Sequence, residues 1–313
     1  MSDTNFSGLS VAGTPISGGV YPYFGAQGKV FFVCSSAAKY AYTHALYPPV
    51  KGVTRVFLQD ATHNGIQSAI DACRDGYGDV IMVEPGYFLV TTQIVLNKNR
   101  VSIIARKPGR RNTVLFGGSA SYGAWTSDLL KITAGYFNIV GLSFYSYSTT
   151  NSAILCDDAG GGGDYGGFGQ FIDCTFPPEG GGVGSEKYGV DVKGANNIDF
   201  INCEFIGQLS GGIRFRGGVG NPINPLVKEC RFIGCVSGIE VASAVYNGVM
   251  DDCFVGTATY PAGMSITQGI LSNGGGGEWA IRKCHGSLTA ANFVQGIGIT
   301  TIGDTSGGYT QLT

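Results

Sequence analysis

The sequence predicts an all-β fold: a single-stranded, right-handed parallel β-helix with an N-terminal capping helix. Three observations predict it: a composition rich in glycine and aromatic residues, a strand pattern that recurs at a regular interval, and an amphipathic helix just before the first strand. The 313 residues include 52 glycines, 18 phenylalanines and 16 tyrosines. Abundant glycine beside abundant aromatic residues is typical of many strands joined by tight turns, and it argues against a disordered chain.

A cysteine marks each copy of the repeat. In five copies an apolar residue stands three positions before the cysteine, and an earlier copy carries leucine in place of the cysteine. The positions of this ladder are Leu142, Cys174, Cys203, Cys230, Cys253 and Cys284. From each cysteine to the next, the residue number rises by 29, 27, 23 and 31. A period of roughly 27 residues is in the range of repeat proteins and predicts a solenoid in which each copy forms one coil.

The columns of the repeat describe the path of a coil. The cysteine and the residue two positions after it share one face of a strand, whereas the apolar residue three positions before it is out of phase with that face. The chain must therefore turn a corner between them. A second strand, with the pattern glycine, apolar, polar, apolar, follows each cysteine, and its glycine is expected to form a bend. These strands start at Gly189, Gly212, Gly238, Gly269 and Gly296.

The distance from each cysteine to the following strand varies, while the strands keep their length. Insertions therefore collect at one corner of the solenoid, where the loops 177–188 and 256–268 project. Repeat proteins usually place binding on the face that carries such insertions.

We expect the ladder cysteines to be buried, structural and reduced. Cysteine is a small hydrophobic residue that can stack on the coil below it. Neighbours about 4.8 Å apart are within the range of disulfides, but thiols stay reduced in a cytoplasmic product. A metal site is the weaker alternative, because no Cys-x-x-Cys pair exists and His44, His63 and His285 lack ligand spacing. No metal or cofactor is predicted, and His63 is interpreted as a turn or cap residue.

Residues 56–78 are predicted to form a capping region, because the open end of a solenoid must be covered. Apolar residues recur at helical spacing within 64–75, with Asn64 or Asp60 near the start of the helix and Gly76 at its end. The first strand follows at once, so we assign 79–313 to the β-helix.

The segment IQSAIDACRDGYGDVIMVEPGYF, at residues 66–88, is followed by an extended turn and VSIIARK. This opening resembles that of the pectin-lyase-like β-helix superfamily, most closely the version found in bacteriophage virion proteins, namely tailspikes and head-associated β-helical proteins. As a pattern, the resemblance covers about residues 57–300. It implies a homotrimer, the state of many phage members, and some members cleave polysaccharide.

Residues 1–55 differ in character and are interpreted as an N-terminal arm. They are poor in charge, and they carry the aromatic residues Tyr21, Tyr23, Phe24, Phe31 and Phe32. A frayed terminus is the alternative, but frayed tails rarely carry so many aromatic residues. We predict that the arm docks on a phage capsid or tail protein, with a strand at 29–33 as its ordered part.

Composition excludes several partners. The net charge of −2 and the pI near 5.9 give no electrostatic reason to expect nucleic acid. No apolar run reaches the roughly 18 residues of a membrane span, so no membrane insertion is predicted. No lysine or arginine precedes Lys29, so we expect no secretory signal. The expected location is the virion, after assembly in the host cytoplasm.

The resemblance implies that enzymes with this fold act through carboxylates, arginine or lysine in a groove on the outer face of the coils. The motif set of the glycosidase branch is absent as a whole, although the pairs Asp157-Asp158 and Asp251-Asp252 are present. Acidic pairs alone are weak evidence, because most are solvated corners.

One geometric candidate for catalysis remains. The position just before each ladder cysteine points outward, which places Glu229 and Asp252 on successive coils, near the roughly 5–5.5 Å of the carboxyl pair in retaining glycosidases. Against catalysis, Lys283 follows in the same column, and Arg231 stands beside Glu204 in the next outward column. Those neighbours are typical of ordinary cross-strand charge pairing.

Two functions therefore stay open. The first is a structural virion protein (capsid decoration, head fibre or spike) that docks by its arm. The alternative is a tailspike-type polysaccharide depolymerase, a hydrolase or lyase that would use Glu229 and Asp252 on a host-surface glycan. Depolymerising tailspikes generally carry more coils and a further C-terminal module, so we expect the structural function and assign no catalytic residue.

Overall fold

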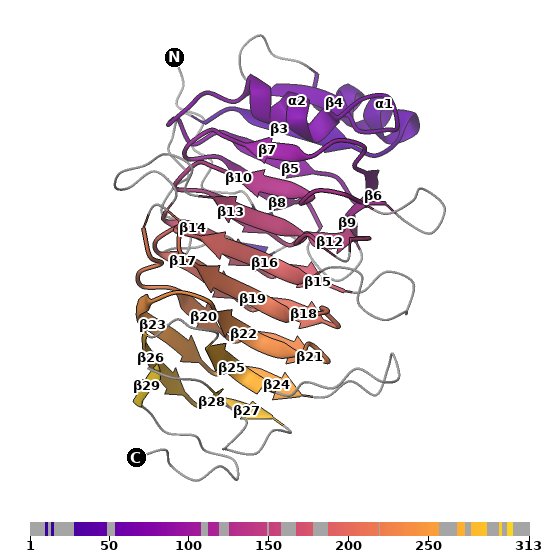
Figure 1. Cartoon of the computed structure of the whole chain (residues 1–313). Coiled ribbons are helices and arrows are strands. Elements are labelled where there is room, and N and C mark those ends of the chain that lie inside the picture. The colour runs from indigo at the N-terminus through magenta and orange to yellow at the C-terminus, as the bar shows by residue number, and fades with distance from the viewer. Residues whose placement is uncertain are drawn as a thin grey trace.

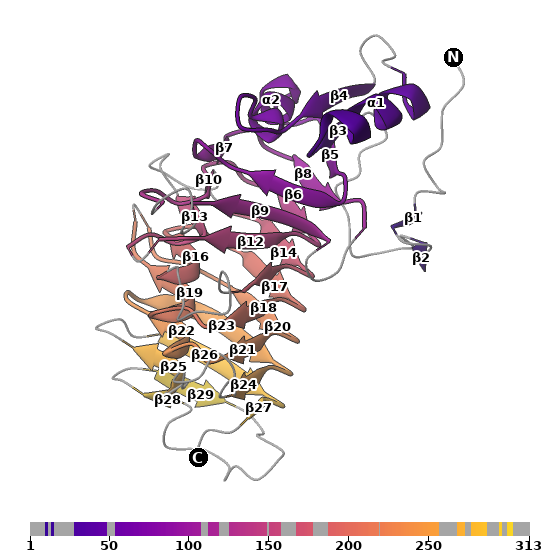
Figure 2. The ribbon, with the colours of Figure 1, turned by 90° about the vertical axis from the view of Figure 1, so that its right-hand side faces the viewer.

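The computed structural model is a solenoid of stacked coils (Figure 1). Each coil passes in the same order through three parallel sheets, and Figure 2 shows the strands of all three stacked along one axis. The predicted right-handed parallel β-helix is thus confirmed. The structure describes residues 10–11, 14–15, 28–48, 54–107, 112–118, 125–148, 150–157, 167–177, 187–218, 220–256, 268–272, 277–286, 294–295 and 299–302.

We number the sheets in the order in which a coil visits them. The first sheet consists of β3 (Val30–Cys34), β4 (Thr54–Leu58), β5 (Val80–Val83), β8 (Ser102–Ala105), β11 (Asn138–Val140), β14 (Gly169–Ile172), β17 (Ile198–Ile201), β20 (Leu226–Lys228), β23 (Val245–Asp251), β26 (Gly277–Arg282) and β29 (Ile299–Ile302). The second sheet consists of β6 (Gly86–Leu89), β9 (Thr113–Gly117), β12 (Ser143–Ser146), β15 (Thr175–Phe176), β18 (Glu204–Ile206), β21 (Arg231–Ile233), β24 (Phe254–Gly256) and β27 (His285–Gly286). The third sheet, which faces the viewer in Figure 1, consists of β7 (Ile94–Leu96), β10 (Leu130–Ile132), β13 (Ile154–Asp157), β16 (Tyr188–Lys193), β19 (Gly211–Arg216), β22 (Ser237–Val241), β25 (Gln268–Ser272) and β28 (Val294–Gln295).

The ladder lies at the corner between the first and second sheets. Its leucine and all five cysteines are buried, and all nine cysteines of the chain are free and buried. Each ladder thiol also donates a hydrogen bond to a backbone carbonyl of the previous coil, for example Cys203 Sγ to Phe171 O at 3.3 Å and Cys230 Sγ to Phe200 O at 3.4 Å. The predicted buried thiols are confirmed, and they satisfy backbone acceptors as well as filling space.

The residue before each ladder position turns the corner in the left-handed backbone region. The φ angles there are +72° at Gly141, +55° at Asp173, +51° at Asn202, +55° at Glu229, +51° at Asp252 and +50° at Lys283. Glycine and asparagine adopt this conformation readily, whereas glutamate and lysine do so rarely. The corner is therefore fixed by the stacking of coils and not by residue type alone. The outward direction predicted for this column is confirmed, because four of its members are exposed.

The glycines that open the third-sheet strands have a different role from the predicted one. Gly189 and Gly212 have ordinary negative φ angles, so they form no bend. A Cβ atom at Gly212 would lie 2.5 Å from the ring of Phe232, and one at Gly189 would lie 2.6 Å from the ring of Phe205. These glycines make room for aromatic rings that fill the interior. The strand predicted to start at Gly296 needs a correction, because Val294–Gln295 (β28) pairs with β25 in the third sheet and Ile299 belongs to β29 of the first sheet.

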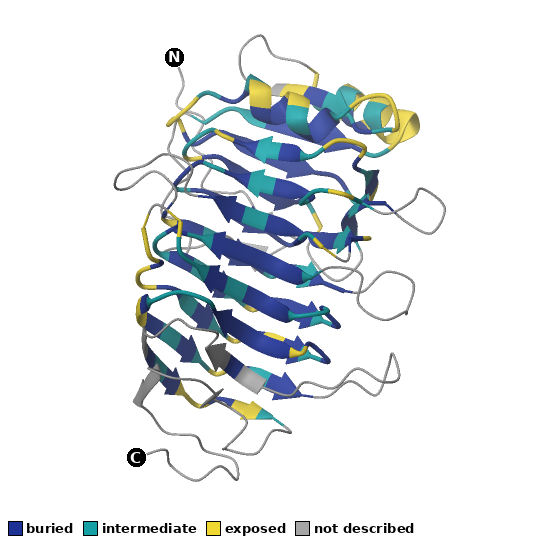
Figure 3. Cartoon of the chain, in the orientation of Figure 1, coloured by how far each residue is buried: buried dark blue, intermediate teal, exposed yellow. Residues whose placement is uncertain are grey.

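Aromatic rings form continuous stacks inside the solenoid. Phe144, Phe176, Phe205 and Phe232 succeed one another along the second sheet with ring centroids 5.5, 4.7 and 5.1 Å apart. All four are fully buried, and burial of each such side chain stabilises the fold by about 1.5–3 kcal/mol. Figure 3 shows the buried residues running along every sheet, so the core extends through the whole solenoid.

The N-terminal end is closed by α2 (Gly65–Ala72), which packs against β3, β4 and β7. Its N-cap is Asn64, whose side chain accepts a hydrogen bond from the backbone of Gln67 at 3.0 Å. The predicted capping helix is confirmed, although it ends at residue 72 and not at 75. None of the helices in the described part of the chain is both long and apolar enough to cross a membrane.

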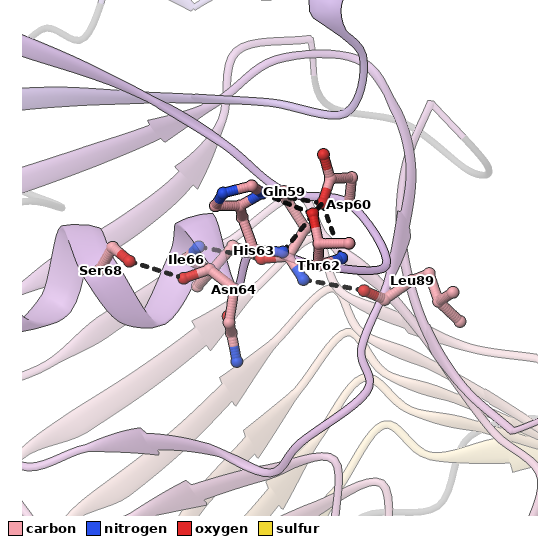
Figure 4. A network of polar contacts seen from close by, with 8 residues as sticks. All are labelled: Gln59, Asp60, Thr62, His63, Asn64, Ile66, Ser68 and Leu89. Carbon is pink, nitrogen blue, oxygen red and sulfur yellow. Dashed lines mark hydrogen bonds and ion pairs between the residues drawn. The ribbon is translucent and has the colours of Figure 1, made fainter.

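A compact polar turn leads into α2 (Figure 4). Asp60 accepts hydrogen bonds from the backbone N–H groups of Thr62 and His63, both at 2.8 Å, and its carboxylate lies 3.2 Å from Nδ1 of His63. Gln59 joins the turn to the first coil, because it donates to Leu89 O and accepts from Ile66 N. The prediction that His63 is a turn residue is confirmed.

The predicted arm needs a correction. β3 lies between β4 and β5 in the first sheet, and α1 (Ala37–Leu46) follows it at the same end of the solenoid. Residues 28–48 therefore belong to the end of the β-helix, and Phe31 and Phe32 are buried inside this chain. The ordered strand at 29–33 is confirmed as β3. Before residue 28, the structure describes only the short antiparallel pair of β1 (Ser10–Val11) and β2 (Thr14–Pro15).

Candidate functional site

A shallow depression on the outside of the second sheet holds both predicted carboxylates. Its volume is about 370 Å³, and it is lined by Glu229, Cys230, Arg231, Asp252, Phe254 and His285. The lining comes from consecutive coils, because Arg231, Phe254 and His285 occupy matching positions on β21, β24 and β27. Glu229 and Asp252 stand at the preceding corner of their coils. The structure thus brings together the two residues that sequence analysis chose, and it adds an aromatic ring and an imidazole.

The side chains of the depression are open to water. Glu229 lies 3.3 Å from Lys228, and both side chains are nearly half exposed. In the described part of the chain the carboxylate of Asp252 has no ion pair, so the predicted pairing with Lys283 does not form. In a catalytic site that excludes water, the electrostatic interactions of a carboxylate with the substrate are stronger. This depression offers groups that can contact a polar ligand, but no desolvated acid.

The neighbouring charge pair behaves as predicted in one respect and differs in another. Arg231 approaches the carboxylate of Glu204 at 3.6 Å, which confirms the cross-strand pair. The side chain of Glu204, however, is only 6% exposed although it points away from the core. Its partner is 53% exposed, so the pair lies at the edge of the protein surface. Phe254 occupies the matching position on the next coil, and its ring centroid lies 5.7 Å from the guanidinium of Arg231.

A second cluster of charged residues lies on the outer face of the third sheet. Asp191 on β16 is buried and accepts hydrogen bonds from two arginines of β19: Arg214 Nε lies 3.0 Å from Oδ1, and Arg216 Nη2 lies 2.9 Å from Oδ2. The guanidinium of Arg214 also covers the ring of Tyr188 at 4.3 Å. Tyr188 in turn donates to Glu240 on β22 at 2.7 Å. One network therefore joins three successive coils.

Asp157 forms a similar centre on β13. Lys131 from β10 and Lys193 from β16 reach its two carboxylate oxygens at 3.0 and 2.9 Å. Burial alone would raise the pKa of Asp157, but the hydrogen bonds from Lys193 and Lys131 outweigh burial and hold the pKa below its ordinary value. The carboxylate is therefore a fixed negative charge that ties three strands together.

Two further groups in this region have a raised pKa. Burial, with the nearby charge of Asp191 as a smaller cause, raises the pKa of Asp128. Burial and the hydrogen bond to Glu240 raise the pKa of Tyr188 to about 12. Asp128 uses one carboxylate oxygen to accept from Ser152 N at 3.0 Å.

Sequence analysis did not single out this cluster, although a signal for it was present. Asp191, Arg214 and Glu240 are the polar members of the repeated pattern glycine, apolar, polar, apolar, and their charges alternate in sign from coil to coil. The parallel register of neighbouring coils places these opposite charges side by side. The sequence pattern shows this pairing only after the strands are known to be parallel neighbours. Asp158, which follows Asp157 in the acidic pair Asp157-Asp158, lies outside the described residues.

Across the described ranges, no three histidine, cysteine or acidic residues gather closely enough to hold a metal ion.

Comparisons with known proteins support the fold. No family model and no curated protein matches the sequence. Among solved structures, a rhamnogalacturonan lyase is 13% identical over 83% of this chain and 68% of its own, with a TM-score of 0.54. The ORF18 protein of Geobacillus virus E2 is 12% identical over 90% of this chain and 75% of its own, with a TM-score of 0.43. The Dettilon tailspike protein is 13% identical over 80% and 64%, with a TM-score of 0.35. The likeness to the lyase is one of fold alone, and it agrees with the right-handed β-helix described above.

Proposed function

We propose that this chain is a structural protein of a bacteriophage particle, a capsid decoration, head fibre or spike, that docks on a capsid or tail protein through its N-terminal segment. The proposal rests on the likeness of the opening segment, residues 66–88, to phage β-helix proteins, and on the state of the outer charges. Asp157 and Asp191 are each held by two cationic side chains. Charges that are paired in this way brace neighbouring coils, and this bracing is the observation that favours a structural role over a catalytic one.

The docking segment is shorter than the arm predicted from sequence. Because β3 and α1 belong to the solenoid, docking is assigned to residues 1–27. Phe31 and Phe32 are used inside the chain, whereas Tyr21, Tyr23 and Phe24 lie outside the described residues. Burial of these three aromatic side chains on a partner would contribute roughly 1.5–3 kcal/mol each before ordering costs. A homotrimer would repeat the attachment and gain avidity.

Deletion of residues 2–27 tests the proposal. The truncated protein keeps β3 and α1, so we expect it to melt cooperatively like the full chain. It should fail to join particles in an add-back assay, because the docking contacts are gone. A triple variant, Tyr21→Ser, Tyr23→Ser and Phe24→Ser, should fail in the same way.

Tyr87→Ser is the matched control, because it removes an aromatic ring that is 65% exposed on β6 without touching the segment. This control should load normally. Loading of the truncated protein at the level of the full chain would contradict the proposal. Deletion through residue 55 is not a suitable test, because it removes β3 from its place beside β5.

A polysaccharide depolymerase is the second candidate, because Glu229 and Asp252 line one depression together with His285. This candidate predicts that Glu229→Gln and Asp252→Asn each abolish cleavage of a bacterial capsule or lipopolysaccharide glycan, as measured by release of reducing ends. Asp173→Asn, at the same corner two coils before Glu229, should leave cleavage intact. Glycan cleavage that depends on Glu229 would replace the structural proposal, and the absence of any cleavage would remove this candidate.

A further inference from the structure

The outer face of the first sheet carries a row of apolar residues that is separate from the interior of the solenoid. In β8, β11 and β14, the residue just before each of these belongs to the interior core, so the row itself points outward. Register places the outward residues of successive coils beside one another. We call this row the outer strip, and it consists of Met82, Ile104, Val140, Ile172 and Ile201.

The outer strip is buried although it lies outside the solenoid. Ile104, Val140 and Ile172 are only 1%, 4% and 5% exposed. In the described part of the chain, Tyr40 and Tyr47 pack on the same apolar cluster. Helix α1, however, mainly contacts β3 and β4, so it covers only the end of the cluster nearest the cap. The strip therefore needs a further cover where it crosses β8, β11 and β14.

A row of polar side chains runs beside the outer strip and contains two buried acceptors. Asn138 donates to Ser102 Oγ at 3.1 Å, and Gln170 donates to Asp199 Oδ2, also at 3.1 Å. The carbonyl oxygens of the two amides, Asn138 Oδ1 and Gln170 Oε1, are buried and accept no hydrogen bond within the described residues. Asn138 is only 2% exposed as a whole. We call these four residues the polar row.

The outer strip and the polar row together suit an extended polypeptide. Its apolar side chains would cover the strip, which removes apolar surface from water. Its backbone N–H groups would donate to the amide oxygens of Asn138 and Gln170, because a buried acceptor without a donor is unfavourable. A ligand without N–H donors would leave these oxygens unsatisfied.

The N-terminal segment, residues 1–27, is the polypeptide that the structure favours. It is joined directly to the first sheet, because the backbone of Lys29 donates to Asp79 at 2.6 Å just before β3 begins. Figure 2 shows β1 and β2, which belong to this segment, on the outer side of the first sheet. The one charged side chain of the segment is Asp3. Its aromatic residues are Phe6, Tyr21, Tyr23 and Phe24.

We propose that the outer strip and the polar row bind the chain's own N-terminal segment in the free protein. The length of the segment allows this, since 27 extended residues span up to about 90 Å and the strip crosses five strands, about 19 Å. The inference goes beyond the proposed function, because it concerns the chain before it meets a particle. A segment that docks on a particle would first have to leave this surface.

Thiol labelling of the purified full chain, without particles, tests the proposal. Val140→Cys places a thiol in the middle of the outer strip, while all nine native cysteines are buried and free. Its rate of reaction with a maleimide reagent is compared between the native segment and the triple variant Tyr21→Ser, Tyr23→Ser and Phe24→Ser. We expect the triple variant to react on the order of ten-fold faster, because its segment opens more often. Deletion of residues 2–27 should raise the rate at least as much.

The matched control is Val236→Cys, a 43% exposed position between β21 and β22, which should react at one rate in all three backgrounds. The native cysteines report folding, because they should stay unlabelled in each protein. Equal rates at residue 140 with and without residues 2–27 would overturn the proposal. Protection that is lost when the full chain is diluted would also overturn it, because the segment of a second copy would then be the cover. Failure here leaves the particle assay untouched, since the two experiments share no readout.

Discussion

At the scale of single residues, the ladder cysteines combine two properties that no other small residue offers together. The thiol is apolar enough to sit in a dry stack, and it donates a hydrogen bond to a backbone carbonyl of the previous coil. Valine would fill the space but would lose this hydrogen bond. Burial also raises the pKa of Cys174 and Cys203 well above that of an ordinary thiol, so these groups stay protonated and unreactive.

Cys230→Asp tests this account of the ladder. Cys230 is fully buried, so the new carboxylate must either stay charged in an apolar stack or take up a proton, and we expect a loss of several kcal/mol of unfolding free energy. Lys228→Ala, two residues away, removes an exposed ion pair and should cost about 1 kcal/mol or less. Denaturant unfolding measures both. Equal losses would mean that the faces of the strand are assigned wrongly.

The sequence predicts the inner residues better than the outer ones, and physics explains the difference. Burial requires an apolar residue at the same position in every copy of the repeat. The ladder and the residues three positions before it can therefore be recognised in the sequence. The left-handed corners at Glu229 and Lys283 leave no such mark, because these residue types rarely adopt that backbone conformation. The predicted outward stacking of Glu229 and Asp252 was correct, yet the ion pair of Glu229 with Lys228 depends on side-chain directions that a pattern does not contain.

At the scale of elements, the third sheet is joined on its outside by ion pairs that cross from coil to coil. Lys131, Asp157 and Lys193 come from β10, β13 and β16, and Asp191 links β16 to β19. The backbone hydrogen bonds between parallel strands are evenly spaced, so they do not by themselves fix which residues of two neighbouring strands lie side by side. Alternating charges at matching positions penalise a slipped register, because a slip brings like charges together.

Acid should weaken the Asp157 centre. Because the pKa of Asp157 in the folded chain is below its ordinary value, the stability that this carboxylate contributes is present above about pH 4 and is lost as the pH falls through the folded pKa. Asp157→Asn should lower the melting temperature at pH 7, since it leaves Lys131 and Lys193 facing each other. Melting curves of the two proteins should converge below pH 4. A difference that stays constant with pH would show that the ion pairs do not stabilise the fold.

The elements at the N-terminal end were the hardest to predict. The sequence of α1, AAKYAYTHAL, is apolar around most of its circumference, so it lacks the two-sided pattern by which an amphipathic helix is recognised. β4 pairs with β3 across α1, and β3 also pairs with β5, which follows only after α2 in the sequence. Such pairings are set by tertiary contacts. The capping helix α2 was predicted because only one of its sides is buried.

At the scale of the whole molecule, the parts of the solenoid that stabilise the fold differ from the parts that vary in length. The strands recur from coil to coil and the ladder recurs from Leu142 to Cys284, while the length of chain between successive ladder positions varies. Each coil contacts mainly its neighbours, so a change in one connecting loop alters the surface without disturbing the coils beyond.

The central claim is that these coils stack around a dry interior whose cysteines are all free. Thiol labelling tests it most directly. A maleimide reagent followed by mass spectrometry should modify few or none of the nine cysteines in the native protein, and all nine after denaturation without a reducing agent. Rapid labelling of several cysteines in the native protein would contradict the buried ladder. Fewer than nine modified cysteines after non-reducing denaturation would show that disulfides link the coils, and the account of the ladder would be wrong.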